Sequence, residues 1–268
     1  MSKYVEYKDL EPSKLIIDKV DKKKVPDNSA SYTLVTFKYN YGTNEAPNYA
    51  RLYIEYPLLS AADGIATFTT KDGSMYSYTS RLLPENPDHE LLRQKLHELY
   101  DRIVELLISV KTQVGMPLAK FTMDTAPVLL KYPVYYPVNK ETSEVIQGVP
   151  PYLACKLMDD KYTKTKFLDL TDAVLTREEL MDCAFDHITL TQWNGVFIGG
   201  GRIAIQNKAY STIITNIYEK QRNTPQKNTL ERLKKNPELI NKLREQKKKL
   251  KEKQESLPSD VSNYVFGE

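Results

Sequence analysis

The stretch GVFIGGGRIAIQNKAYSTII occupies residues 195–214 and says more about the fold class than any other part of the chain. Two short apolar runs, residues 196–198 and 202–206, flank three consecutive glycines. Within the second run, alternation places Ile203 and Ile205 on one side and polar side chains on the other. Apolar runs joined by a glycine turn are typical of a β-hairpin. The stretch therefore predicts a β-sheet with one buried and one open face.

Similar runs recur on both sides of this hairpin, each rich in Val, Ile, Tyr or Thr and bounded by polar or Pro-containing turns. They predict strands at residues 14–20, 32–41, 50–56, 65–70 and 152–158, with shorter extended pieces at residues 132–138 and around Phe167. About five main strands of this kind fit a small barrel better than an open parallel sheet.

One long helix interrupts the strands. Apolar residues recur at helical spacing over residues 88–114, which begin with an Asp after Pro87 and end at Gly115. A shorter helical turn is predicted at residues 176–184. The fold class is therefore α+β and mainly β: an OB-fold-like five-stranded Greek-key barrel with a long helical insertion.

Composition bounds the rest. The chain has 268 residues, enough for a full core without a metal or a disulfide framework, and its only two cysteines fit a reducing compartment. No apolar run approaches the roughly 20 residues that span a bilayer, and the N-terminus lacks a signal-peptide pattern. We therefore expect an intracellular protein. Its 19 Tyr against 7 Phe indicate surfaces that are both apolar and wet.

The charge is uneven along the chain. Residues 219–255 hold 13 Lys/Arg and 6 Asp/Glu, a net +7, and residues 256–268 hold −2; the total of +3 therefore leaves −2 for residues 1–218. This division predicts a barrel domain over residues 1–218, a basic helical C-terminal extension over residues 219–255 and a flexible tail over residues 256–268. The extension can bind phosphates, be an ordinary solvated helix face, self-associate or dock on an acidic partner.

The sequence offers little for catalysis. Cys183 and His187 are four residues apart and would share one helical face, but a buried thiol beside a helix-end histidine explains them more simply. Two cysteines and three histidines show no zinc-ligand spacing, so no metal or cofactor is expected. The glycine run lacks the Lys-Ser/Thr of a phosphate-binding loop, and Asp159 with Asp160 fits a solvated loop. We therefore expect a binding protein and not an enzyme.

A nucleic-acid interface has more support. Binders of single strands combine aromatic rings for stacking with Lys/Arg along the phosphate path. Several predicted strands place both on their polar face. Packing at a barrel rim explains any single tyrosine better, but the repeated pattern favours binding. Trp193 next to Asn194-Gly195 is expected to anchor a turn. The candidate nucleic-acid-binding residues are Lys38, Arg51, Tyr53, Tyr152, Lys156, Lys166, Arg202, Gln206, Lys208, Lys247, Lys248 and Lys249.

The chain resembles the OB-fold single-stranded DNA-binding proteins of nucleocytoplasmic large DNA viruses, which are likened to the replication protein of T7-type phages. The opening LIID after Lys14, the strand ARLYIEY from Ala50, the segment PYLACKL from Pro151 and above all residues 195–214 carry the resemblance. It covers most of residues 14–218.

The resemblance implies sequence-independent coating and protection of single-stranded DNA in viral replication, repair and recombination. It implies a location in the host cytoplasm, a viral replication site or the nucleus. It also implies that an aromatic-ended tail, here Tyr264 and Phe266, contacts a polymerase or recombination protein, although this tail has few carboxylates. Two alternatives stay open: a structural or virion-assembly protein acting through protein contacts, including self-association, and an RNA-binding module.

Overall fold

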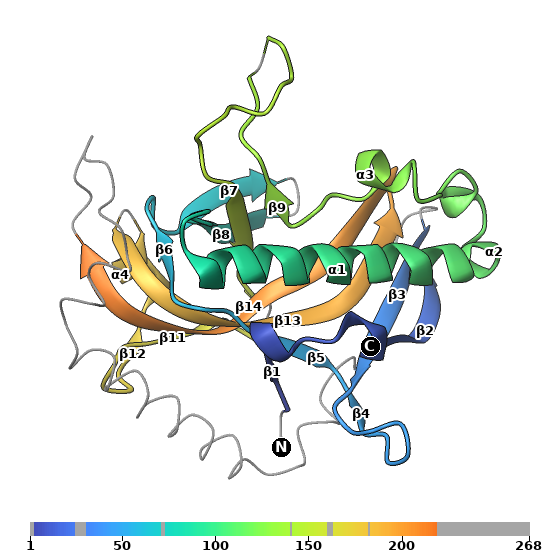
Figure 1. The fold of residues 1–268 in the computed structure, drawn as a ribbon, viewed down its shortest axis with the longest axis horizontal. Coiled ribbons are helices and arrows are strands. Elements are labelled where there is room, and N and C mark those ends of the chain that lie inside the picture. Colours follow the sequence, from blue (N-terminus) through green and yellow to red (C-terminus); the bar gives the residue numbers. More distant parts are fainter. Residues whose placement is uncertain are drawn as a thin grey trace.

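A computed structural model describes residues 3–24, 31–70, 73–139, 141–159, 163–181 and 183–218. The fold within these residues is α+β and mainly β, and every strand belongs to one mixed sheet. Figure 1 shows the longest helix lying across one side of this sheet. No helix of the described part is long and apolar enough to cross a membrane. The predicted basic extension and tail fall outside the described residues.

The strands in chain order are β1 (Val5–Glu6), β2 (Leu15–Lys24), β3 (Ser31–Asn40), β4 (Tyr49–Ala50), β5 (Leu52–Glu55), β6 (Leu59–Ala61), β7 (Ala66–Thr70), β8 (Gly73–Arg81), β9 (Val134–Tyr135), β10 (Tyr152–Lys156), β11 (Lys166–Leu168), β12 (Val174–Leu175), β13 (Ala184–Gly199) and β14 (Arg202–Tyr218). The helices are α1 (Pro87–Ser109), α2 (Lys111–Val114), α3 (Ala126–Leu129) and α4 (Arg177–Leu180), with short 3₁₀ turns at Tyr7–Asp9, Pro12–Lys14 and Met116–Leu118.

The long hairpin of β13 and β14 is the central element of the sheet. Gly200 and Gly201 have φ of 57° and 71° at its turn, a backbone conformation that glycine adopts without steric cost. Further along β13, Gly195 faces Thr36 of β3, and a Cβ there would meet the carbonyl oxygen of Val35 at 2.0 Å. The glycines therefore make both the turn and the close approach of β3 to β13.

Five strands close into a ring. The hydrogen-bonded path runs β14, β13, β6, β8, β10, and an isolated parallel bridge between Leu157 and Ala209 returns it from the end of β10 to β14. We call this the strand ring. Its inner face buries Tyr78, Leu153 and Phe185. The outer side chains of β10 and β14, including those that precede Leu157 and Ala209, consequently lie side by side.

Beyond the ring, the same two long strands continue into a wider sheet. The half of β13 nearest the turn pairs with β3, and β3 pairs with β2. Helix α1 begins at the N-cap Asn86, whose side chain accepts a hydrogen bond from the Asp88 N–H. Its apolar stripe, including Leu92, Leu96 and Ile103, packs into one continuous core with the sheet.

Several expected elements differ from those observed. The hairpin predicted at residues 196–198 and 202–206 is far longer, because buried polar residues conceal its strand periodicity. The helix predicted over residues 88–114 is two helices that meet at Val110, and it starts one residue earlier. Strand β8 was not predicted, because its sequence GSMYSYTSR is rich in serine. The helical turn expected at residues 176–184 is the shorter α4.

Candidate nucleic-acid interface

The interior of the strand ring holds a compact polar network. His187 is fully buried; its Nε2 lies 2.8 Å from the Ser80 hydroxyl and its Nδ1 lies 2.9 Å from the Thr189 hydroxyl. The Tyr78 hydroxyl lies 2.7 Å from Thr189 Oγ1 and 3.0 Å from Thr212 Oγ1. Burial, and then the charge of His89, lower the pKa of His187 to about 3. These groups satisfy one another inside the core, which fits a structural role.

Two expectations about this region are wrong. His187 lies in β13, so that Cys183 and His187 do not share a helical face, and the hydrogen bonds of His187 go to Ser80 and Thr189. Trp193 does not anchor a turn: it is buried within β13, and its Nε1 donates a hydrogen bond of 3.1 Å to Thr191 Oγ1. Of the two acidic residues considered above, Asp159 forms an ion pair with Arg177, and Asp160 lies outside the described residues.

A row of polar side chains crosses β5, β13, β14 and β10. The last three strands belong to the strand ring, and the row lies on the outer face of the ring. Tyr53 of β5 pairs with Gln192 of β13, and Gln192 pairs with Lys208 of β14. The bridge between Leu157 and Ala209 sets Lys156 beside Lys208. Gln192 Nε2 donates a hydrogen bond of 2.7 Å to the Tyr53 hydroxyl. The row therefore runs from a tyrosine ring at β5 to two ammonium groups at the junction of β14 and β10.

A third lysine joins this pair. Leu130 forms a parallel bridge with Ile203 of β14, which brings the exposed Lys131 into the same neighbourhood. Desolvation first, and then the charges of Lys131 and Lys208, lower the pKa of Lys156. Within the described residues, none of these three lysines forms an ion pair. Three like charges held together without a carboxylate favour an anionic ligand.

Tyrosine rings flank the lysines on both sides. Along β10, the Tyr152 ring lies 5.7 Å from Arg81 Cζ and 6.5 Å from the exposed Tyr135 ring. On the other side, the rings of Tyr53 and Tyr210 meet edge to face at 5.2 Å. Edge-to-face pairs leave ring surface free for a further stacking partner. We call the whole surface the cation–tyrosine face; it consists of Tyr53, Arg81, Lys131, Tyr135, Tyr152, Lys156, Gln192, Lys208 and Tyr210.

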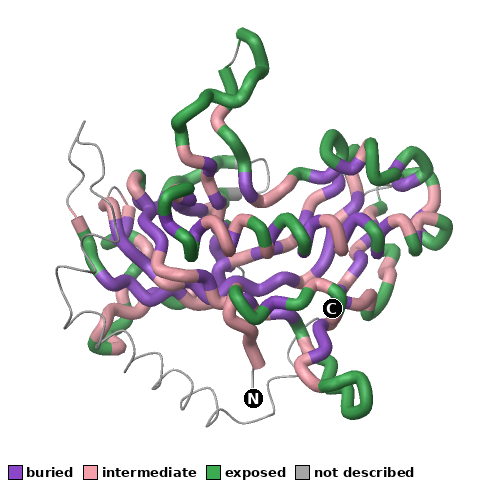
Figure 2. Tube along the Cα trace, viewed as in Figure 1, coloured by how far each residue is buried: buried purple, intermediate pink, exposed green. Residues whose placement is uncertain are grey.

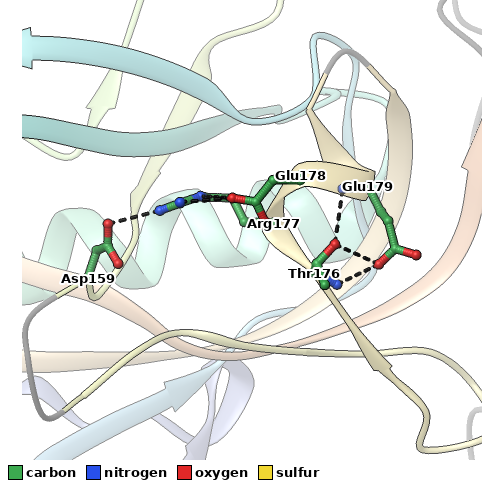
Figure 3. A network of polar contacts seen from close by, with 5 residues as sticks. All are labelled: Asp159, Thr176, Arg177, Glu178 and Glu179. Atoms are coloured by element: carbon green, nitrogen blue, oxygen red, sulfur yellow. Dashed lines mark hydrogen bonds and ion pairs between the residues drawn. The ribbon is translucent and has the colours of Figure 1, made fainter.

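A polar network next to this face fixes the segment that follows β10. Figure 3 shows Arg177 between Asp159 and Glu178. Its Nη1 lies 2.9 Å from Asp159 Oδ2, and its guanidinium carbon lies 3.6 Å from the centre of the Tyr76 ring. Thr176 and Glu179 form a capping box that starts α4. The contacts tie α4 to both β8 and the end of β10, and so hold the edge of the cation–tyrosine face in place.

The structure brings together four of the nine predicted nucleic-acid-binding residues that it describes. Tyr53, Tyr152, Lys156 and Lys208 lie on the cation–tyrosine face. Other predicted residues border or leave it: Arg51 is exposed beside Tyr53, Lys166 pairs with Ser211 of β14, Gln206 lies on the outer side of β14, Arg202 lies at the distant hairpin turn, and Lys38 is ion-paired to Asp18 at 2.7 Å. The pairing of Lys38 neutralises its charge and makes it a poor candidate. Lys247, Lys248, Lys249, Tyr264 and Phe266 fall outside the described residues.

Sequence reasoning missed the other five members of the face: Arg81, Lys131, Tyr135, Gln192 and Tyr210. Simple alternation from Lys208 places Tyr210 on the same side, so a local signal for that residue existed. No local signal existed for Lys131, which depends on the pairing of Leu130 with a strand some 70 residues later. Among the described residues, no cluster of three or more His, Cys, Asp or Glu side chains can hold a metal ion.

Comparison with known proteins finds a distant structural likeness. No protein family and no curated protein matches the sequence. Among solved structures, the fold is similar to a single-stranded DNA-binding protein from bacteriophage Enc34, with a TM-score of 0.36 and 11% sequence identity over 79% of this chain and 95% of that one. At this distance the likeness does not show a shared function. The resemblance to the viral family stays a prediction.

Proposed function

We propose that the protein binds single-stranded DNA without sequence preference along the cation–tyrosine face. The observation that carries this proposal is the group of Lys131, Lys156 and Lys208, which has no carboxylate partner among the described residues and lies between tyrosine rings. Lysines attract the phosphates, and the rings stack on bases, since every base has a π-face whatever its identity. Stacking requires unpaired bases, so this arrangement favours a single strand over a duplex.

The order of the strands supports an OB-type barrel. Numbered along the chain, β6, β8, β10, β13 and β14 follow one another around the ring as 1, 2, 3, 5, 4 and back to 1. Every neighbouring pair is antiparallel except β10 with β14. OB-folds use the face of strands 2 and 3 for oligonucleotides. In this chain that face carries Arg81, Tyr152 and Lys156.

The dimensions of the face fit a short stretch of one strand. From Tyr53 to Lys156 the path crosses three strand spacings of about 4.8 Å, and from Lys156 to Tyr152 it follows four residues of about 3.3 Å. The total is about 27 Å. This length corresponds to the lower end of the roughly 4 to 16 nucleotides that one OB-fold covers.

Such binding serves to coat and protect DNA strands, and we extend the proposal to viral DNA replication, repair and recombination, without catalysis. The basic extension at residues 219–255 would add phosphate contacts, and Tyr264 and Phe266 would contact a replication partner. These parts rest on the sequence alone.

The test is a titration of the purified chain with labelled oligo-dT and with the matching duplex, followed by fluorescence anisotropy at low and at physiological salt. Tight binding to oligo-dT that salt weakens, with much weaker binding to the duplex, is the expected result. Equal binding to both would reduce the role of the face to general attraction of polyanions. A competition between poly-U and oligo-dT then separates DNA from RNA binding, because a contact to the 2′-hydroxyl favours RNA.

A further inference from the structure

An arm projects from the body after β9. We define it as residues 136–139 and 141–149; a bridge between Val138 and Val145 and a hydrogen bond of 2.9 Å from the Ile146 N–H to the Pro137 carbonyl give it a hairpin shape. Figure 1 shows the arm projecting away from the sheet, and at its base the Tyr136 hydroxyl accepts a hydrogen bond of 3.1 Å from Arg93 Nη1 of α1. Its shape is therefore held by its own backbone and not by packing on the core.

The arm is apolar as well as exposed. Large apolar side chains on it face solvent: Tyr136, Val138, Val145, Ile146 and Val149. Figure 2 shows nearly the whole arm as exposed, in contrast to the buried strands below it. Single exposed apolar residues are normal, but several together on one projecting segment mark an interaction site.

A second apolar surface lies at the other end of α1. We define the acceptor surface by its exposed members Met116, Met123, Val128 and Leu129, of which Met116 is 87% and Val128 is 86% exposed. Figure 1 shows the short helix α3, which carries Val128, apart from the arm. The arm therefore does not cover this surface within its own chain.

The charges around the two surfaces are complementary. The arm carries Glu141 and Glu144, and no ion pair of either is seen within the described residues. Lys111 and Lys120 lie in the same segment of the chain as the acceptor surface, and neither forms an ion pair within the described residues. Asp124, four residues after Lys120, is the acidic residue of this segment. With Lys140 counted from the sequence, the arm has a net charge of −1 and the acceptor surface +1. Complementary rims of this kind favour and orient an apolar contact.

We propose that the arm of one copy packs on the acceptor surface of a second copy of this chain. Because the two surfaces differ and lie apart, each added copy brings a further free arm or acceptor surface, and the assembly grows beyond a dimer, as a ring where the rotation closes and as an open chain where it does not. Copies held on one DNA strand would meet at high effective concentration, so even a weak contact would make coating cooperative. The contact itself does not depend on DNA binding.

The test is sedimentation velocity of the full chain without DNA over a wide range of concentrations. The wild type is expected to form species larger than a dimer as concentration rises. The arm variant V145S/I146S and the acceptor variant M116S/V128S are each expected to self-associate at least about tenfold more weakly. Val174→Ser, an exposed apolar residue in neither surface, is the matched control and should behave as the wild type does.

Mixing the two variants decides the geometry. The acceptor variant keeps an intact arm and the arm variant keeps an intact acceptor surface, so an equal mixture should form dimers and nothing larger. A wild type that stays monomeric to the highest attainable concentration would overturn the proposal, as would a mixture that fails to dimerise. Because the charge reversals E141K/E144K and K111E/K120E alter no buried residue, recovery when these two variants are mixed separates lost contact from lost folding. If oligo-dT binding fails while this assembly is seen, the proposed function alone is contradicted.

Discussion

Inside the strand ring, both ring nitrogens of His187 have hydroxyl partners, whereas on the outer face Lys156 is subject to the charges of two other lysines. Both groups have a lowered pKa, and burial is the first cause of each. The difference is that the inner group is neutral and satisfied, while the outer group has no counterion among the described residues. A buried polar group whose hydrogen bonds are all made stabilises one fold, whereas a surface charge without a counterion attracts a ligand of opposite charge.

The largest expected effect is on stability and concerns His187 inside the strand ring. An unfolded histidine takes up a proton near pH 6.5, whereas folded His187 does so at about pH 3. The unfolded state therefore binds more protons between these values, and the stability that neutral His187 provides is present above pH 6.5 and lost as the pH falls toward 3. Between about pH 7 and about pH 4 we expect a loss of roughly 3 kcal/mol from this residue.

Urea unfolding of the wild type and of His187→Gln over this pH range measures the effect. The variant should show a shallower pH dependence, while His97→Gln, a change at an exposed histidine, should leave the wild-type slope in place. If wild type and His187→Gln have the same slope, His187 is not held neutral and the contrast between the two faces fails.

The next largest effect is on oligo-dT affinity and concerns the lysines of the cation–tyrosine face. Changing Lys131, Lys156 and Lys208 together to Gln removes the three charges that lack a partner, and we expect oligo-dT affinity at low salt to fall on the order of 100-fold. The slope of log affinity against log salt should decrease by about 2, because each phosphate contact to a single strand contributes about 0.7. The melting temperature should not fall, since the change relieves repulsion.

The matched control for this variant is K19Q/K22Q/K24Q. It removes the same net charge from β2, away from the cation–tyrosine face. An equal loss of affinity in both triple variants would mean that net charge, and not this face, attracts the DNA.

How far the sequence predicts these two faces follows from the range of the interactions. Alternation within a strand is local, and it correctly placed Leu153 and Cys155 inside and Tyr152 and Lys156 outside. It failed for most of β13, where buried Thr189 and Gln192 break the apolar pattern that marks a strand. Their partners come from distant segments, so their burial has no local signature.

The candidate site was predictable only in pieces. Tyr53, Tyr152, Lys156 and Lys208 each follow from alternation in a single strand, but their meeting depends on pairings far apart in sequence, such as Leu157 with Ala209. Lys38 shows the converse: alternation placed it outwards, yet Asp18 neutralises it across the β2–β3 pair. Sequence periodicity gives the direction of a side chain, and the topology decides its neighbours.

A smaller effect separates stacking from charge. Tyr152→Ala should weaken oligo-dT binding about tenfold, within the roughly 1 to 3 kcal/mol that stacking on one base contributes. Tyr152→Phe keeps the ring and should bind almost as the wild type does. Tyr49→Ala, an exposed tyrosine on β4 away from the face, serves as the control. Equal losses for the Ala and Phe variants would assign the contact to the hydroxyl group instead of the ring.

The smallest effect concerns the protonation of Lys156. Burial and the charges of neighbouring lysines lower the pKa of Lys156, so a bound phosphate changes its protonation. A phosphate beside the ammonium group favours the charged form and raises the pKa of Lys156, so binding takes up protons. The contribution of Lys156 to affinity is present below its lowered pKa and is lost as the pH rises through it. We expect the decline in oligo-dT affinity to begin at a lower pH than the pH at which an ordinary lysine loses its proton. Lys131→Gln removes one of the neighbouring charges and should move this decline to higher pH, while an unchanged profile in that variant would show that Lys131 does not act on Lys156.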